Sequence, residues 1–286
     1  MGVIREIRSV LKRTPTMEGA GVHLHRVFGH AEVPMCDPFL LLDDFRSDIP
    51  EHYLKGFPWH PHRGIETITY VLTGDVAHGD SLGNQGTISS GDVQWMTAGS
   101  GIIHQEMPKG DAAGKMHGFQ LWANLPARQK MMRPRYRDLS SEQIPEVSFP
   151  DGTRVKIISG QVAGVKGPVA DIVIDPEYLD VAVPAGCEFT HDTKPDHTVF
   201  VYVIGGSGRF DEGADAAAAA DNGTLLLFGD GTGIKVAADE KGVRFLLIAG
   251  KPLGEPVAWQ GPIVMNTQAE LQLAFEEYRQ GTFIKA

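Results

Sequence analysis

Short apolar runs, each five to seven residues long and rich in β-branched side chains, recur along this chain between glycine, aspartate, asparagine or proline residues. Their length and their bounding turn residues favour strands over helices. The clearest runs are Glu66–Leu72, Val93–Thr97, Gly118–Ala123, Val155–Ser159, Leu179–Val183, Val199–Ile204, Thr224–Phe228 and Arg244–Ile248. Many regularly spaced strands and few helices predict an all-β sandwich or barrel.

Only two stretches have a helical pattern. In Thr267–Gln280, Thr267 is positioned to cap the first turn, and one helical face carries Leu271, Ala274, Phe275 and Tyr278. A second, brief candidate lies near Ser140–Ile144. We therefore expect a β protein with a C-terminal helix.

A shift of 132 residues brings matching landmarks of the two halves into register. Tyr70-Val71-Leu72 falls on Tyr202-Val203-Ile204, and Gly74, Gly91, Gly99 and Gly101 fall on Gly206, Gly223, Gly231 and Gly233. Glycines recur where a backbone turns tightly, so shared glycine spacing indicates a duplicated fold. The predicted domains are 1–145 and 146–286, which meet in the turn-rich segment Pro145–Gly152. The alanine run 216–220 is predicted to be a mobile loop insertion.

Two pairs of polar residues have the spacing of metal ligands on strands. His60-x-His62 follows a glycine-containing turn, and His104-x-Glu106 follows Gly99-Ser-Gly101. Residues i and i+2 of a strand point to the same face, so two such pairs on neighbouring strands surround one point. A single His-x-His pair is a weak signal, whereas two pairs beside glycine-flanked strands predict one metal bound by His60, His62, His104 and Glu106.

Three imidazoles and a carboxylate suit a single divalent ion such as Fe(II), and also Mn, Ni, Cu or Zn. An octahedral ion would keep two open positions for substrate or oxygen, whereas a structural zinc site is closed and usually rich in cysteine. The chain has only two cysteines, Cys36 and Cys187. The pattern therefore favours a reactive metal centre over a structural one.

Other residues near these pairs are candidates for lesser roles. Glu66 could be a fifth ligand or could orient a ligand by hydrogen bonding. His78 could be a pocket residue or a turn residue. Four apolar side chains flank the ligands, and those on the ligand face are expected to wall a pocket: Phe57, Trp59, Trp95 and Met96.

The net charge of −10 at pH 7 disfavours a nucleic-acid-binding surface, which needs lysine and arginine against phosphate. One basic cluster is interpreted as a solvated loop and strand edge: Arg128, Lys130, Arg133, Arg135 and Arg137. No apolar segment long enough to span a bilayer is present. We expect a cytoplasmic monomer that contacts neither nucleic acid nor membrane.

The motif set resembles the pirin family of the cupin superfamily over nearly the whole chain. The segments that carry the resemblance are Pro38–Phe45, His60–Gly64, Gln94–Gly99, the His104/Glu106 pair, Gln120–Pro126 and Met265–Gln268. The resemblance implies a bicupin, two tandem antiparallel jelly-roll barrels, with a metal in the N-terminal barrel alone. It also implies the ligands His60, His62, His104 and Glu106. Glu66 stands where many cupins, but generally not pirins, have a glutamate ligand.

The internal repeat bears on the second barrel. Under the 132-residue shift, the four predicted ligands fall on Asp192, Lys194, Val236 and Ala238. A one-residue slip would place His191 and Thr193 in the first pair, which still lacks a second imidazole. Valine and alanine donate nothing to a metal, so we expect the second domain to be metal-free.

Three functions are compatible with such a centre. The first is an iron-dependent dioxygenase that cleaves a flavonol such as quercetin with O2, as prokaryotic members of the family are described, with Glu106 as the catalytic base. The second is a non-enzymatic, redox-sensing regulator that binds a protein partner, as eukaryotic members are described. The third is a cupin acting on another small molecule, since the fold alone does not decide the function.

Overall fold

In the computed structural model of the protein, residues 2–210 and 219–285 are described, and they form two compact units built mainly of antiparallel strands. The first unit, here called the N-terminal barrel, comprises Thr14–Ser141 and Leu253–Ala286. The second, the C-terminal barrel, comprises Met1–Arg13 and Glu142–Pro252. The all-β architecture and the C-terminal helix are as predicted.

The N-terminal barrel contains two main sheets and a hairpin. Its strands are β2 (Thr14–Glu18), β3 (Val22–Phe28), β4 (Phe39–Asp44), β5 (Phe57–His62), β6 (Ile65–Thr73), β7 (Asp75–Asp80), β8 (Gln85–Ile88), β9 (Val93–Thr97), β10 (Ile102–Lys109), β11 (His117–Asn124), β12 (Arg135–Leu139), β23 (Ala258–Gln260) and β24 (Ile263–Met265). One sheet has the order β12-β9-β6-β11-β4-β3-β2, the other has the order β5-β10-β7-β8, and β23 pairs with β24. Short helical segments are α1 (Val33–Cys36), η1 (Pro50–His52) and η2 (Ala127–Gln129).

The C-terminal barrel repeats this arrangement in one branched sheet and has a separate two-stranded hairpin. Its strands are β1 (Ile7–Lys12), β13 (Glu146–Ser148), β14 (Arg154–Ser159), β15 (Gln161–Val162), β16 (Val165–Lys166), β17 (Glu177–Val183), β18 (Glu188–Asp192), β19 (Thr198–Arg209), β20 (Ala220–Asp221), β21 (Thr224–Phe228) and β22 (Gly233–Gly250). The order β1-β21-β19-β22-β17-β14-β13 matches the long sheet of the N-terminal barrel strand for strand, with β18 beside β22 and β20 beside β19, and the hairpin pairs β15 with β16. The shared order is what a duplicated fold requires.

The compact units differ from the predicted domains, 1–145 and 146–286, at both ends of the chain. Strand β1, from the start of the chain, pairs with β21 and takes the edge position that β12 holds in the other barrel. The segment from Leu253 onward belongs to the N-terminal barrel. Strand pairing between residues far apart in sequence sets these boundaries, and a scan along the chain does not detect it.

Two of the repeated glycines show why the spacing is shared. Gly91 and Gly223 have φ values of 93° and 91°, in the left-handed region that favours glycine. Each lies in the turn just before an equivalent strand, β9 or β21. The same backbone requirement therefore holds in both barrels.

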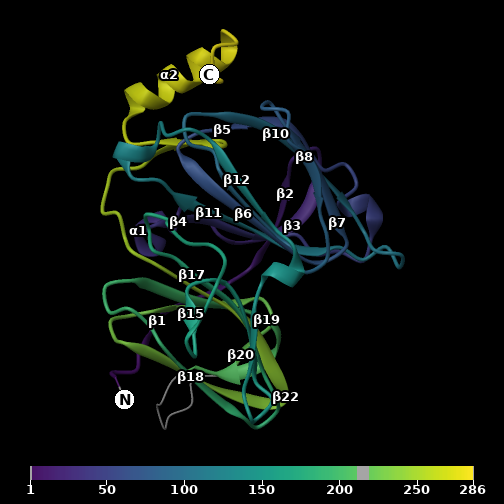
Figure 1. The fold of residues 1–286 in the computed structure, drawn as a ribbon, viewed down its shortest axis with the longest axis vertical. Helices are drawn as coiled ribbons and strands as arrows, with labels where there is room; N and C mark the ends of the chain where they lie inside the picture. The colour runs from purple at the N-terminus through teal and green to yellow at the C-terminus, as the bar shows by residue number, and fades with distance from the viewer. Residues whose placement is uncertain (1, 211–218, 286) are drawn as a thin grey trace. The chain divides into compact units, whose positions relative to one another are not determined.

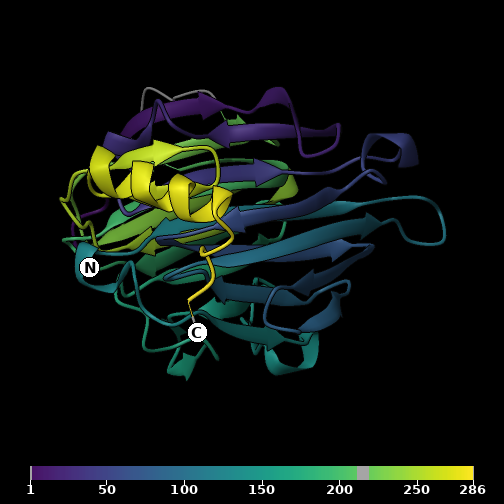
Figure 2. The same ribbon diagram turned by 90° about the horizontal axis from the view of Figure 1, so that it is seen from above.

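All eight predicted strands lie within observed strands. The predicted C-terminal helix is α2 (Gln268–Arg279), which Thr267 caps in a capping box with Glu270. It lies outside the sheets, at one end of the N-terminal barrel (Figure 1, and from above in Figure 2). The candidate near Ser140–Ile144 is a single turn, η3 (Ser141–Gln143).

The structure also bears on the sequence interpretations of the alanine run and the basic cluster. Of the alanine run predicted as a loop, Ala220 begins β20, and residues 216–218 lie outside the described residues. Within the basic cluster, Lys130 is only 1% exposed, so the interpretation of the whole cluster as solvated was wrong there. Both cysteines are free. No helix among the described residues is long and apolar enough to cross a membrane.

Candidate metal centre

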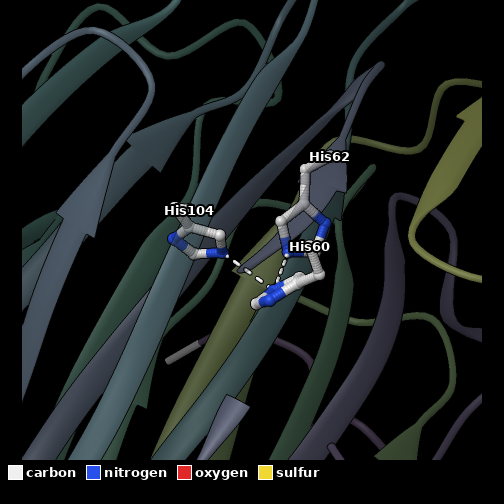
Figure 3. A group of neighbouring side chains, drawn as sticks. All are labelled: His60, His62 and His104. Carbon is white, nitrogen blue, oxygen red and sulfur yellow. Dashed lines mark hydrogen bonds between the residues drawn. The ribbon is translucent and has the colours of Figure 1, made fainter. Parts of the chain in front are cut away.

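Three of the four predicted ligands meet on the sheet formed by β5, β10, β7 and β8. In the antiparallel register of β5 and β10, His60 stands opposite His104. His62 follows His60 by two residues, so both imidazoles lie on the same face of β5. Ligand nitrogens of the three histidines lie within 4.8 Å of one another, and the rings point toward one another (Figure 3). Strand pairing thus gathers the residues that the sequence singled out.

Backbone carbonyls fix the tautomers of two of these rings. Nδ1 of His60 lies 2.9 Å from the carbonyl oxygen of Pro58, and Nδ1 of His62 lies 3.1 Å from that of Pro262. Because a carbonyl oxygen only accepts, each Nδ1 carries the proton and donates it. A neutral imidazole has one N–H, so Nε2 of each ring presents a lone pair.

The distances between these nitrogens fit a bound cation. Nε2 of His60 lies 3.0 Å from Nε2 of His62 and 3.0 Å from Nε2 of His104. Two facing lone pairs at this distance repel each other unless a positive charge lies between them. With a metal–nitrogen bond of about 2.1 Å, nitrogens this far apart subtend roughly 90° at the ion, the angle of octahedral rather than tetrahedral ligands. The donor set fits a borderline ion that keeps open positions.

Electrostatics favours the neutral, metal-binding form of two of these histidines. Burial lowers the pKa of His62 and of His104 well below the usual range, and repulsion from the neighbouring histidines lowers both further. Neutral imidazole is the form that binds metal. Nδ1 of His104 is buried and has no hydrogen-bond partner within the described part of the chain.

Glu106 lies beside this cluster, two residues after His104 on β10. One carboxylate oxygen, Oε2, lies 3.9 Å from Nε2 of His104. Thr69 donates to Oε1 over 3.1 Å, and Gln120 donates to Oε2 over 3.1 Å. Thr69 and Gln120 stand opposite each other on β6 and β11, so adjacent strands hold the carboxylate in place. Glu106 is therefore oriented next to the histidines, which is consistent with its predicted role as the fourth ligand.

Glu66 and His78 serve other contacts. The carboxylate of Glu66 accepts hydrogen bonds from Trp95 at 3.1 Å and Thr97 at 2.6 Å. Burial raises the pKa of Glu66. His78 lies on β7 with Nε2 3.0 Å from the amide nitrogen of Gln94, so the interpretation as a turn residue was wrong.

A largely apolar cavity of about 570 Å³ adjoins the cluster. This volume lies within the range of small-molecule sites. Ligand candidates and aromatic side chains share its wall: His60, His62, Glu106, Gln120, Phe45, Phe57, Trp122 and Trp259. A substrate in this cavity would lie directly against three of the four predicted ligands, His60, His62 and Glu106.

Most of the predicted pocket walls lie elsewhere. Only Phe57 lines the cavity. Trp59 is 52% exposed, while Trp95 and Met96 are buried in the barrel. Trp122 lines the cavity and was not predicted, although the sequence contains a signal for it. Gln120 and Trp122 are two residues apart on β11, so both point to the same face, and both line the cavity. The interior position of Trp259, from the far end of the chain, has no such local signal.

One part of the cavity wall is charged. Arg26 donates to both carboxylate oxygens of Asp43, over 2.9 Å and 2.8 Å, and lies 3.0 Å from Glu18. Burial raises the pKa of Asp43 to about 6, although Arg26 opposes that rise. This pair adds a fixed set of polar groups to a part of the cavity wall away from the histidines in sequence.

The C-terminal barrel places different residues at the equivalent positions. In the β18–β22 register, Phe189 stands opposite Val236 as His60 stands opposite His104, and His191 opposite Ile234 as His62 opposite Ile102. The sequence alignment of His60 and His62 onto Asp192 and Lys194 was therefore wrong. The loop after β18 spans Thr193–His197 where Arg63–Gly64 follows β5, which shifts the register by three residues.

Comparison with known proteins covers both barrels. The Pirin family model matches residues 21–123, and the model of the pirin C-terminal cupin domain matches residues 178–284. A pirin-like protein from Caulobacter vibrioides is 44% identical over 281 residues, which are 98% of this chain and 99% of that protein. Pirin-1 from Arabidopsis thaliana is 41% identical, with 97% of this chain and 92% of that protein covered.

A solved structure has a similar fold over nearly the whole chain. The crystal structure of quercetin 2,3-dioxygenase from Acinetobacter baumannii matches with a TM-score of 0.89 at 30% sequence identity, over 98% of each chain. Together with the family models, this match extends over both barrels and the C-terminal helix. The chain belongs to the pirin family, a branch of the cupins.

Proposed function

We propose that this protein is a metal-dependent dioxygenase of the pirin type that cleaves a flavonol such as quercetin with O2. The observation that carries the proposal is the pair of Nε2 atoms, on His60 and His62, that face each other across 3.0 Å in the wall of a largely apolar cavity. The similarity to a structure named quercetin 2,3-dioxygenase supports the reaction class.

The residues that would hold the ion are His60, His62, His104 and Glu106. Fe(II) is the proposed ion, because mixed imidazole and carboxylate ligands with open positions are typical of non-haem iron oxygenases. When bound, the ion supplies Lewis acidity, which lowers the pKa of a hydroxyl group coordinated to it.

The side chains of the chain bind and orient the substrate. Phe57, Trp122 and Trp259 offer flat apolar surface on which fused aromatic rings are buried away from water. The Arg26–Asp43 pair supplies fixed partners for hydroxyl groups at the rim of such rings. Glu106 accepts the proton of the reacting hydroxyl as general base, while Gln120 and Thr69 keep its carboxylate oriented.

The test is oxygen uptake and carbon monoxide release with quercetin, using Fe(II)-loaded protein purified without oxygen. His62→Ala is expected to abolish both signals, because it removes a predicted ligand. The matched control is His191→Ala, the equivalent histidine of the other barrel, which should retain the wild-type rate. Equal rates for the His62 variant and the wild type would refute the proposal. Iron-loaded wild-type protein that does not turn over quercetin would instead favour the second function, a redox-sensing regulator that binds a protein partner.

A further inference from the structure

The end of the chain contributes directly to the centre described above. Residues 253–286, here called the C-terminal strap, contain β23, β24 and α2 and belong to the N-terminal barrel. The carbonyl oxygen of Pro262 accepts the Nδ1 proton of His62 over 3.1 Å. Trp259, Gly261 and Pro262 also line the cavity. The strap therefore sets the tautomer of one predicted ligand and forms part of the substrate wall.

A buried arginine next to that ligand anchors the strap. Arg63 follows His62 directly and is 2% exposed. Its guanidinium donates from Nη1 to the carboxylate of Glu277 over 2.7 Å and from Nη2 to the carbonyl of Phe283 over 2.8 Å. The guanidinium carbon also lies 4.2 Å from the centre of the Phe283 ring. Helix α2 and the residues after it are thus both hydrogen-bonded to the side chain of Arg63.

The same guanidinium also reaches the second ligand strand. Nε of Arg63 donates to the carbonyl of Ser100 over 2.7 Å, in the loop that leads into β10 and His104. Arg63 itself lies between β5 and β6, directly after His62. One planar fork therefore connects both ligand-bearing strands and the strap. Lysine, with a single nitrogen, cannot make these three contacts in fixed directions.

Backbone contacts bring the strap close beside Arg63. The amide of Val264 donates to the carbonyl of Arg63 over 3.1 Å. A Cβ on Gly64, whose φ is +79°, would lie 1.9 Å from the carbonyl oxygen of Val264, so only glycine permits this approach. The ammonium group of Lys130 donates to the carbonyls of both Gly64 and Val264. The chain after His62 and the strap are held together at several points.

We propose that the C-terminal strap is an integral part of the metal centre and that Arg63 is its positioning residue. The inference rests on the proposed metal ligands. Arg63 fixes the strap, the strap carbonyl of Pro262 orients His62, and the Ser100 contact fixes the approach of His104. Loss of such outer contacts typically weakens metal binding 10- to 100-fold.

The experiment titrates Co(II) alone into metal-free protein and records both the affinity and the visible absorption spectrum. Arg63→Lys keeps the charge and loses the fork, so the affinity should fall about 10- to 100-fold with an altered spectrum. Glu277→Gln is the milder variant, which keeps the fold testable, and should lower the affinity several-fold.

Two variants serve as matched controls. Arg244→Lys disrupts a bidentate pair with Asp180 in the C-terminal barrel, and Glu276→Gln changes a neighbouring helix residue whose side chain bonds Gln280. Both should keep wild-type affinity and spectrum. Folded Arg63 and Glu277 variants with the wild-type affinity and spectrum would overturn the inference. Wild-type protein that binds no Co(II) would overturn the metal centre itself, and the inference with it.

Discussion

The two barrels share one strand order and differ in the side chains at their centres. Around the histidine cluster, the N-terminal barrel has His60, His62, Thr69, His104, Glu106 and Gln120. At the same register positions, the C-terminal barrel has Phe189, His191, Val201, Val236, Ala238 and Leu247. Five of six polar groups are replaced by apolar ones. The same backbone therefore supports either a polar centre or a dry core.

The apolar set is part of a continuous core. Phe189, Val236 and Ala238 pack in one buried cluster together with Val201 and Leu247. The remaining imidazole, His191, lies 3.0 Å from the carboxylate of Glu177 and stacks on Phe189. The apolar side chains of this core pack without an ion. The facing imidazole lone pairs of the N-terminal barrel, by contrast, repel each other unless a cation lies between them. We predict on this basis that the C-terminal barrel binds no metal.

The largest expected effect comes from replacing a histidine of the N-terminal barrel by the residue at the equivalent position of the C-terminal barrel. His60→Phe removes the nitrogen that faces both other histidines and fills its space with a ring. The metal content of protein purified without oxygen should fall from one ion per chain to none. The reciprocal change, Phe189→His, should gain no ion, because Val236 and Ala238 offer no donor atoms. An ion retained by the His60 variant would count against the assigned ligands.

The next prediction tests the packing of the apolar core in the C-terminal barrel. Phe189→Ala removes a ring from the buried cluster of the C-terminal barrel and should cost about 3–5 kcal/mol of unfolding free energy. Urea denaturation provides the measurement. The metal content should stay at the wild-type level. A loss below about 1 kcal/mol would indicate that this position is not part of a well-packed core.

A smaller effect is expected from the partners of Glu106. Thr69→Val and Gln120→Leu each install the residue of the C-terminal barrel and remove a hydrogen bond to the carboxylate. Metal affinity should fall about 10- to 100-fold for each, because outer partners orient a ligand. Isothermal titration of metal-free protein measures this. Unchanged affinity in both variants would show that Glu106 does not bind the ion.

The smallest expected effect is a change in the free energy of unfolding with pH. Burial lowers the pKa of Lys130 in the N-terminal barrel to about 7, and the described part of the C-terminal barrel contains no buried lysine. Between pH 7 and the ordinary lysine pKa near 10.4 the unfolded chain binds a proton that the folded chain lacks, so stability rises with pH.

The rise should be about 1 kcal/mol from pH 6 to pH 8. Denaturation of the wild type and of Lys130→Met at both pH values measures it. The variant loses three hydrogen bonds and should be less stable throughout, but without this rise. The same rise in the variant would assign the pH dependence to other groups.

The sequence predicted what depends on local periodicity. His60 and His62 share a face because side chains alternate along a strand, and the apolar runs marked the strands for the same reason. Thr69 was missed, although it is one of the polar residues in the buried strand β6. The contact of Gln120 with the same carboxylate became apparent only when the strands paired.

The remaining features depend on contacts between distant residues. The hydrogen bond from His62 to Pro262 joins residues 200 positions apart, and the ion pair of Arg63 with Glu277 spans 214. Such contacts leave no periodic pattern in one sequence. The register of His191 was misjudged for a local reason, since a longer loop shifted one strand without changing the glycine spacing that guided the alignment.

The most direct test of a single metal in the N-terminal barrel is an anomalous difference map from crystals of protein loaded with Fe(II), collected at the iron absorption edge. One peak is expected, among Nε2 of His60, His62 and His104 and within bonding distance of Glu106. A peak between β18 and β22 in the C-terminal barrel, or no peak at the three histidines, would contradict this account.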